Sequence, residues 1–271
     1  KKYLLTKDDC IEMVENLLAI LNRNFQKFSF LVYGTYLHRW RNGISDLDAM
    51  LYFNSDALVN ILCAASMNQM RLEISGLYKK FPFLRSTNFF SDVFIIDQTH
   101  GTDGRFMVHD ADSFNMFFIP GSYEVLYGED FIKSLQPMSL RNQDELYLAM
   151  GLQKLRNYLF FEIPKPISEI SKSDQKEALK YLRVLPRIVS KIIKEPADPI
   201  LEGLKLLKHK FPDIDYMPLY DLWEQSQDYD RLNEYLKGWH KSGKSIFFDC
   251  WRCYELTLKA LVNNHPRRSR S

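Results

Sequence analysis

The sequence predicts a mixed α/β (α+β) fold, with a small mixed β-sheet in the N-terminal half and an α-helical bundle in the C-terminal half. Helical and strand-like patterns alternate over the first half. From residue 140 to 263 nearly every segment carries helical periodicity, interrupted by prolines. A chain of 271 residues is long enough for two such units, which we place at 1–138 and 139–271.

The first half begins with the pattern of one helix and two strands. The residues "CIEMVENLLAILNRNF" have apolar positions at three- and four-residue spacing, which predicts a helix that Asp8 or Asp9 caps. The segment "FSFLVYG" predicts a strand that ends at Gly34, and "TYLHRW" predicts a short helix or turn. After the loop "RNGIS", the segment "DLDAMLYF" predicts a second strand.

The alternation continues with a second helix and further strands. Helical spacing runs from about Ser55 to Lys80, and "TNFFSDVFIID" then predicts a third strand. The segments "GRFMVHD" and "NMFFI" are candidates for further short strands. Helices that alternate with strands in this way are typical of a central sheet covered by helices.

The bulk composition excludes several classes of protein. With 36 basic and 34 acidic residues the net charge is +2, so no global field attracts the chain to nucleic acid, and a nucleic-acid partner is not favoured. No apolar run approaches the ~20 residues of a membrane span, so no membrane partner is expected. Four cysteines without a framework spacing favour a reducing compartment, and we expect the protein in the cytoplasm.

Three features of the second half have both a structural and a functional interpretation. Cys250 and Cys253 form a CxxC motif within a helical pattern, which favours buried packing over a metal or redox site. Trp223 or Trp239 could stack on a base or sugar, although packing inside the bundle is the simpler interpretation. A basic stripe at helical spacing either faces solvent or holds a triphosphate or an RNA backbone, and it consists of Lys176, Lys180, Arg183, Arg187, Lys191 and Lys194.

Two aspartates stand at the start of the second strand. Residues two apart in a strand project from the same face, so Asp46 and Asp48 present two carboxylates side by side. Such a pair either shares a proton or chelates a hard cation, and oxygen ligands of this kind suit Mg²⁺. Taken alone, the pair fits a polar strand start and a metal site equally well.

The turn that precedes these aspartates has the features of a phosphate-binding turn. Gly34 ends a strand where the backbone can approach a ligand closely, and Thr35 offers a hydroxyl group next to the N–H groups of a short helix. Arg39, with His38 and Arg41, lies on the following loop and either contacts phosphates or faces solvent. A phosphate-binding turn followed by a metal-binding DxD is the layout that nucleotidyl transfer requires.

The run from Gly34 and Thr35 through a short spacer to "SDLD" at Ser45 to Asp48 resembles a known signature. It is similar to the GS…DxD motif of the DNA polymerase β-like nucleotidyltransferase superfamily, with Thr35 where that family most often has Ser. Members include antibiotic adenylyltransferases, poly(A) and CCA-adding polymerases, and minimal nucleotidyltransferase antitoxins. The resemblance implies that Gly34, Thr35 and Ser45 bind the nucleotide, with Arg39 beside them.

The resemblance also implies a third carboxylate on a neighbouring strand. The third predicted strand offers Asp92 and Asp97, which face opposite sides because they are an odd number of residues apart. The segment "SDVFIID" resembles the part of aminoglycoside and lincosamide nucleotidyltransferases in which an acidic residue precedes several apolar ones. By this resemblance Asp92 is the third metal ligand and the base, whereas Asp97 ends the strand and caps the next turn.

The implied activity is Mg²⁺-dependent transfer of a nucleoside monophosphate. Asp46, Asp48 and Asp92 would hold two Mg²⁺ ions, the donor would be a nucleoside triphosphate, with ATP expected, and an unidentified hydroxyl group would be the acceptor. One alternative is an RNA- or protein-directed transferase of the toxin–antitoxin type. Another is a catalytically inactive binding module on the same fold, which an intact carboxylate triad argues against because clustered acids cost stability.

Overall fold

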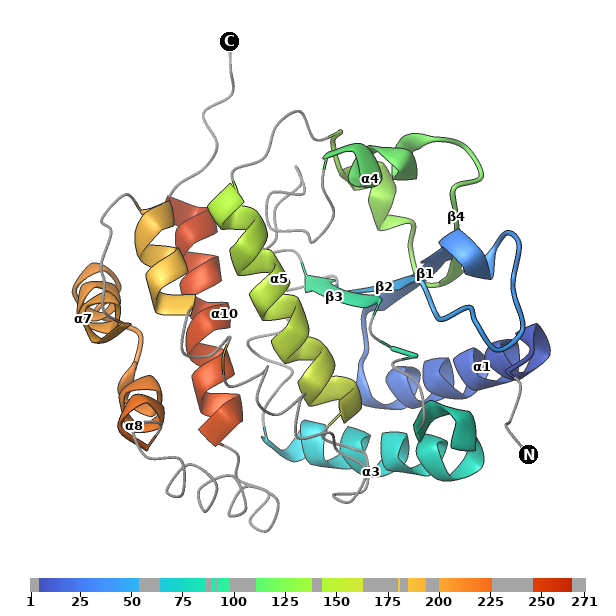
Figure 1. Cartoon of the computed structure of the whole chain (residues 1–271), viewed down its shortest axis with the longest axis horizontal. Helices are drawn as coiled ribbons and strands as arrows, with labels where there is room; N and C mark the ends of the chain where they lie inside the picture. The colour runs from blue at the N-terminus through green and yellow to red at the C-terminus, as the bar shows by residue number, and fades with distance from the viewer. Residues whose placement is uncertain are drawn as a thin grey trace.

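The structure is a computed structural model of the whole chain (Figure 1). It describes residues 5–53, 64–85, 89–90, 92–97, 111–137, 143–162, 180, 185–193, 200–225 and 246–264.

The fold is mixed α+β and is built on a four-stranded mixed sheet with strand order β3-β2-β1-β4. Its strands are β1 (Phe28–Tyr33), β2 (Ala49–Phe53), β3 (Val93–Asp97) and β4 (Tyr123–Tyr127). Strand β1 runs antiparallel to both β2 and β4, whereas β2 and β3 are parallel. The predicted central mixed sheet is therefore present, and the three strands predicted over its first part are confirmed.

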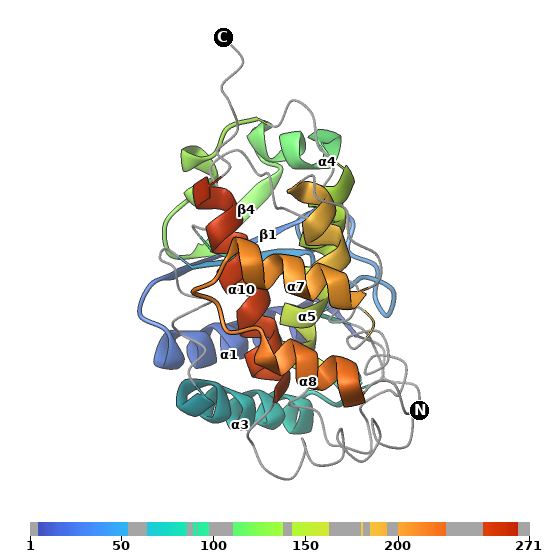
Figure 2. The same cartoon turned by 90° about the vertical axis from the view of Figure 1, so that its left-hand side faces the viewer.

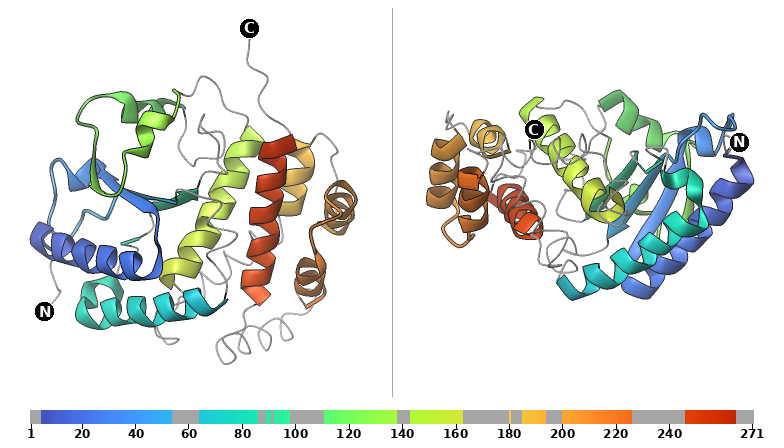
Figure 3. Two further views of the ribbon diagram at one scale, coloured as in Figure 1. Left: turned by 180° about the vertical axis from the view of Figure 1, so that it is seen from behind. Right: turned by 60° about the horizontal axis from the view of Figure 1, so that its bottom comes forward.

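The two faces of the sheet pack against different parts of the chain (Figure 1; Figure 3). Alternate residues such as Phe30, Leu51 and Ile95 belong to a large core shared with α1 (Lys7–Asn24) and α3 (Ala64–Lys80). The strand residues between these point to the opposite face of the sheet. There they form a second, smaller cluster with three short helical segments. These segments are α4 (Ala111–Asn115), η4 (Met116–Phe118) and η5 (Phe131–Ser134).

The first helix begins one turn earlier than the apolar pattern suggests. Thr6 is its N-cap residue, and its hydroxyl oxygen accepts a hydrogen bond from the backbone N–H of Asp9 at 3.2 Å. The Asp9 carboxylate in turn accepts from the backbone N–H of Thr6 at 2.9 Å, which completes a capping box. The prediction that Asp8 or Asp9 is the cap is wrong, because Asp9 occupies the reciprocal third position of the box.

The region after β3 departs from its sequence prediction. The segment "NMFFI" is not a strand, since it forms the end of α4 and the 3₁₀ turn η4. Its aromatic residues look strand-like in sequence, but Phe117 packs one helical turn after Phe114 of α4 in the smaller core. The missed strand is β4, which follows the turn at Gly121. The candidate strand "GRFMVHD" lies outside the described residues, as do residues 55–63 of the predicted second helix.

Every described element from residue 143 onward is helical. These elements are α5 (Gln143–Asn157), the π-helical turn η6 (Tyr158–Glu162), a helix over 185–192, α7 (Ile200–Lys210), α8 (Met217–Gln225) and α10 (Ile246–Asn264). Helices α5 and α10 lie between the sheet and the α7–α8 pair (Figure 1), and α7 and α8 face the viewer in Figure 2. None of the described helices is long and apolar enough to cross a membrane.

Helix α5 supplies hydrogen bonds that a further strand would otherwise make with the edge of β3. The side chain of Gln153 accepts from the N–H of Ile95 at 2.9 Å and donates to the carbonyl of Val93 at 2.7 Å. Arg156 donates to the carbonyl of Ile95 at 2.8 Å, and Asn157 donates to that of Phe90 at 3.1 Å. The backbone on both sides of Asp92 is thereby tied to the helical half of the chain.

Arg156 also links this edge of the sheet to the last helix. Its guanidinium makes two hydrogen bonds with the Glu255 carboxylate, at 2.6 and 2.7 Å, and both side chains are almost fully buried. The indole N–H of Trp251 donates to the same carboxylate at 2.8 Å. Buried charges are tolerated when they are paired and hydrogen-bonded in this way.

Candidate functional site

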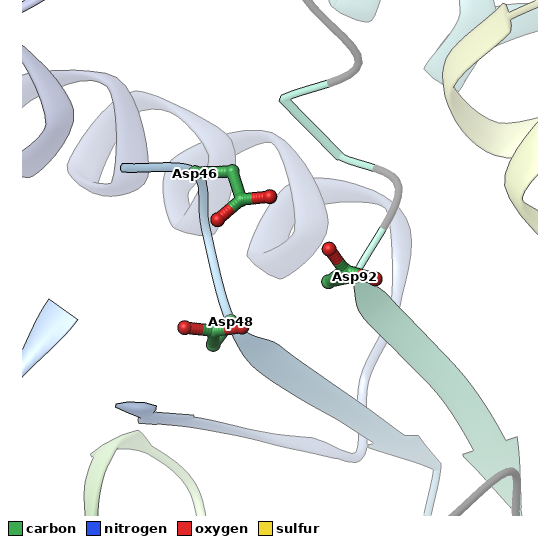
Figure 4. A group of neighbouring side chains, drawn as sticks. All are labelled: Asp46, Asp48 and Asp92. Atoms are coloured by element: carbon green, nitrogen blue, oxygen red, sulfur yellow. The ribbon is translucent and has the colours of Figure 1, made fainter. Parts of the chain in front are cut away.

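Three aspartates meet where β2 and β3 begin (Figure 4). Each of Asp46, Asp48 and Asp92 offers a carboxylate oxygen, and these oxygens all lie within 4.8 Å of one another. All three residues are half-buried. The two aspartates of the DxD motif and the predicted third carboxylate are thus brought together.

The parallel pairing of β2 and β3 explains this convergence. Ala49 lies opposite Val93 in the register, and the N–H of Ala49 donates to the carbonyl of Asp92 at 3.2 Å. Leu47 is fully buried in the large core, so Asp46 and Asp48 on either side of it point the other way. Alternation along β3 places Asp92 on that same side of the sheet.

The alternative candidate on β3 does not join this group. Asp97 is the last residue of β3 and is only 1% exposed. It lies on the same side of β3 as Val93 and Ile95, whose side chains face the large core. In the register it lies opposite Phe53. The interpretation that Asp97 ends the strand is confirmed, whereas the turn that it was expected to cap lies outside the described residues.

The turn after β1 contacts the aspartates directly. Gly34 begins the 3₁₀ turn η1 (Gly34–Tyr36), with a positive φ of 58°. The backbone N–H and the hydroxyl of Thr35 donate to Asp48 Oδ2 at 3.0 and 3.2 Å. A Cβ atom on Gly34 would stand 2.3 Å from that same oxygen, so a glycine is required both by the backbone and by the approach of Asp48.

The loop from Arg39 to Ser45 has a structural role that the sequence did not indicate. The hydroxyl of Ser45 accepts from the backbone N–H of Arg41 at 3.0 Å, so this buried serine closes the loop. Arg39 is exposed and adopts a positive φ of 59°, which costs a residue with a side chain about 1–2 kcal/mol. Nucleotide contacts of Arg39 and Ser45 stay predictions.

The environment of Asp46 and Asp48 raises the pKa of both carboxyl groups. Burial raises the pKa of Asp46, and a hydrogen bond with the Asp92 carboxyl raises it further. Burial also raises the pKa of Asp48, against the opposing effect of the two hydrogen bonds from Thr35. Burial and the nearby Asp48 raise the pKa of Tyr33, which keeps its phenol neutral beside this group.

A divalent cation is the natural partner for such a group of side chains. The donor set consists entirely of carboxylate oxygens, which suits Mg²⁺, whose metal–oxygen bonds of ~2.1 Å separate two ligand oxygens by at most about 4.2 Å. A spacing within 4.8 Å needs only small adjustments to meet this geometry. Among the described residues, this is the group of His, Cys, Asp and Glu side chains that could hold a metal ion.

We expect metal affinity to fall on acidification at a higher pH than for ordinary aspartates. Protons compete with the metal for the carboxylates, and the raised pKa values of Asp46 and Asp48 move this competition above the usual aspartate pKa of about 3.9. Electron paramagnetic resonance titrations with Mn²⁺ at a series of pH values measure this directly. An affinity that stays constant down to pH 4 would contradict the assignment of these ligands.

A cavity of about 380 Å³ opens beside two of the aspartates. Its lining residues all precede the predicted domain boundary and are Tyr33, Gly34, Asp48, Asp92, Phe94, Ser113, Met116, Phe117 and Ser122. Phe94 shares its side of β3 with Asp92, so strand alternation could have identified it. Met116 and Phe117 were missed because their position depends on how residues 111–122 fold back over the sheet.

Cys250, Cys253 and Trp223 belong to the described part of the helical half and do not line this site. Cys250 and Cys253 are buried in α10, and their thiols donate to the backbone carbonyls of Pro218 and Asp215, which agrees with packing. Trp223 packs against the large core. Lys180, Arg187 and Lys191 of the basic stripe are exposed. Trp239 and the other three stripe residues, Lys176, Arg183 and Lys194, lie outside the described residues.

No protein-family model matches this chain, and no curated protein or solved structure shows significant similarity to it.

Proposed function

We propose that the protein is a Mg²⁺-dependent nucleotidyltransferase of the DNA polymerase β-like type, with the sheet half as the catalytic domain and the helical half as a second domain. It would transfer a nucleoside monophosphate, with ATP as the expected donor, to a hydroxyl group. The observation that carries the proposal is the convergence of Asp46, Asp48 and Asp92. The DxD pair and the third acid were expected together on the basis of the resemblance, and a spacing within 4.8 Å suits shared metal ligation.

The three carboxylates have distinct roles in this proposal. Asp46 and Asp48 would hold the metal ions, and Asp92 would hold one of them and accept the proton of the attacking hydroxyl. A bond forms between the acceptor oxygen and the α-phosphorus while the bond from that phosphorus to the pyrophosphate oxygen breaks. When bound, two Mg²⁺ ions would neutralise charge on the phosphates and on the leaving pyrophosphate.

The turn at Gly34 supports binding of the triphosphate. The N–H and hydroxyl of Thr35 already donate to a carboxylate oxygen, so their geometry suits an anionic acceptor. If Asp48 turns toward a metal ion, both donors become available to a phosphate. Arg39 on the next loop supplies a cation. Because its side chain is exposed, this charge carries no desolvation cost in the free protein.

Two further observations bear on the setting of the activity. Cys10, Cys250 and Cys253 are free and buried, as expected for a protein of the cytoplasm. The cluster of three aspartates weighs against an inactive binding module, because clustered acids destabilise the metal-free fold. A macromolecular acceptor would require the basic stripe to face the site, and only part of that stripe is described.

Isothermal titration of ATP and GTP, with and without Mg²⁺, tests the proposal. Wild-type protein is expected to bind at least one nucleotide in a Mg²⁺-dependent manner, and the Asp46→Asn, Asp48→Asn variant is expected to lose this binding. A matched control removes two exposed carboxylates elsewhere, Asp8→Asn with Asp213→Asn, and should bind as wild type does. Absence of nucleotide binding by the wild type at millimolar concentration would overturn the proposal.

A further inference from the structure

We propose that the cavity beside Asp48 and Asp92 binds the acceptor, and that the acceptor is a small, uncharged alcohol or phenol that carries an apolar ring. This inference rests on the proposed function, because it assigns Asp92 the proton of the attacking hydroxyl. It goes further by naming a chemical class of acceptor from the residues that line the cavity.

The walls of the cavity are mainly aromatic and apolar. Tyr33 and Phe94 come from the sheet, and Met116 and Phe117 come from the 3₁₀ turn η4 above it. The rings of Tyr33 and Phe117 meet edge to face, with centroids 5.0 Å apart. Because Phe117 is anchored in the smaller core, these walls are already formed before a ligand arrives.

The charges around the cavity argue against binding of the nucleoside triphosphate there. Among the described residues, its lining includes two aspartates but no lysine, arginine or histidine. These residues supply no cation to a triphosphate, whose place is at the Thr35 donors instead. The two acidic side chains lie together at the sheet, and Met116, Phe117 and Ser122 on the other wall are uncharged. A polycationic acceptor therefore also finds few charged partners in the cavity.

The size of the cavity limits the acceptor further. A volume of about 380 Å³ lies near the lower end of the ~300–1,000 Å³ typical of small-molecule sites. It accommodates one ring with a short substituent. A ligand whose ring packs between Phe94 and Phe117 can direct its hydroxyl group toward Asp92, which lines the same cavity.

One polar group on the wall lacks a partner. The hydroxyl oxygen of Ser122 is buried and makes no hydrogen bond with any described residue. A buried hydroxyl without a partner destabilises the fold unless a ligand binds it. A second polar atom on the acceptor would satisfy this hydroxyl and fix the orientation of the ring.

Methyl NMR of the full chain labelled with ¹³C-methyl methionine tests the inference with 2-phenylethanol as the probe. The signal of Met116, assigned with the Met116→Leu variant, is expected to shift during titration, whereas those of the core residues Met13 and Met70 should stay unchanged. Glycerol and spermidine, at the same concentrations, should leave Met116 unchanged. No shift with 2-phenylethanol at 20 mM, or an equal shift with glycerol, would overturn the inference.

Two variants identify the walls that hold the probe. Met116→Glu places a charge at an exposed position of the lining and should weaken 2-phenylethanol binding by about tenfold or more. Leu72→Glu is its matched control and should have no effect, since Leu72 is also an exposed apolar residue and lies on α3, at the opposite face of the sheet. Ser122→Ala should weaken a probe with two polar atoms, 2-(hydroxymethyl)phenol, by about three- to tenfold without lowering stability. Wild-type affinity in the Met116→Glu variant would overturn the inference.

These measurements separate the inference from the proposed function. The probe is titrated without nucleotide or metal, so its binding does not depend on the proposed reaction. Mg²⁺-dependent ATP binding without probe binding would overturn the acceptor assignment and leave the proposed function standing. Probe binding at Met116 without ATP binding would support the cavity as a ligand site and overturn the proposed function.

Discussion

Arg156→Met is expected to lower the free energy of unfolding by about 3–5 kcal/mol. The substitution removes both hydrogen bonds to Glu255 and leaves that carboxylate buried, with the Trp251 indole as its remaining donor. It also removes the donor to the carbonyl of Ile95 at the edge of β3. Urea denaturation followed by circular dichroism measures the loss, which should appear as a lower midpoint with an unchanged slope.

A second substitution at Glu255 separates the buried charge from the lost packing. In the Arg156→Met, Glu255→Leu variant no charge stays unpaired, so most of the lost stability should return. With the Glu255→Leu single variant added, the effect of the double variant minus the effects of both single variants gives the coupling energy of the pair. A loss below about 1 kcal/mol in Arg156→Met would show that Glu255 finds another partner, and that α5 and α10 do not depend on this pair.

The Asp46→Asn, Asp48→Asn variant is expected to be more stable than the wild type without metal and less stable than the wild type with it. The metal-free wild type holds three carboxylates within 4.8 Å, and their repulsion costs on the order of 1 kcal/mol or more. At free Mg²⁺ 100 times above its Kd, binding stabilises the wild type by about 2.7 kcal/mol. The variant should gain almost none of this stabilisation.

Urea denaturation in EDTA and in excess Mg²⁺ measures both effects. The asparagine oxygen at position 48 can still accept from Thr35, so the turn at Gly34 is retained in the variant. The Asp8→Asn, Asp213→Asn control removes the same charge from exposed positions and should behave like the wild type in both solutions. Equal Mg²⁺ stabilisation of variant and wild type would locate the metal elsewhere.

The arrangement of the three aspartates was largely predictable because it depends on local alternation. Strand alternation places Asp92 and Asp97 on opposite faces, and the resemblance selects Asp92. The buried Leu47 separates Asp46 from Asp48 in the way that an alternating pattern requires. The parallel pairing of β2 and β3 then aligns their starts. Alternation within each strand does not predict that β2 and β3 are neighbours. That expectation came from the resemblance, which implied a third carboxylate on a neighbouring strand.

Other features depend on contacts between residues far apart in the chain. Gln153 and Arg156 look like ordinary polar positions of a helix, and only the docking of α5 against β3 gives them buried partners. Met116 and Phe117 form a wall of the cavity because their segment folds over the sheet, while their local pattern also fits a strand. Periodicity describes one segment at a time and contains no information on such docking.

Diffraction from crystals soaked with Mn²⁺ and a non-hydrolysable ATP analogue tests the central claim most directly. Anomalous density from Mn²⁺ is predicted between the carboxylates of Asp46, Asp48 and Asp92, with phosphate density beside the N–H of Thr35. Metal and nucleotide should be absent together from crystals of the Asp46→Asn, Asp48→Asn variant. Ordered Mn²⁺ at another place in the wild type, with no anomalous density at the three aspartates, would contradict the account.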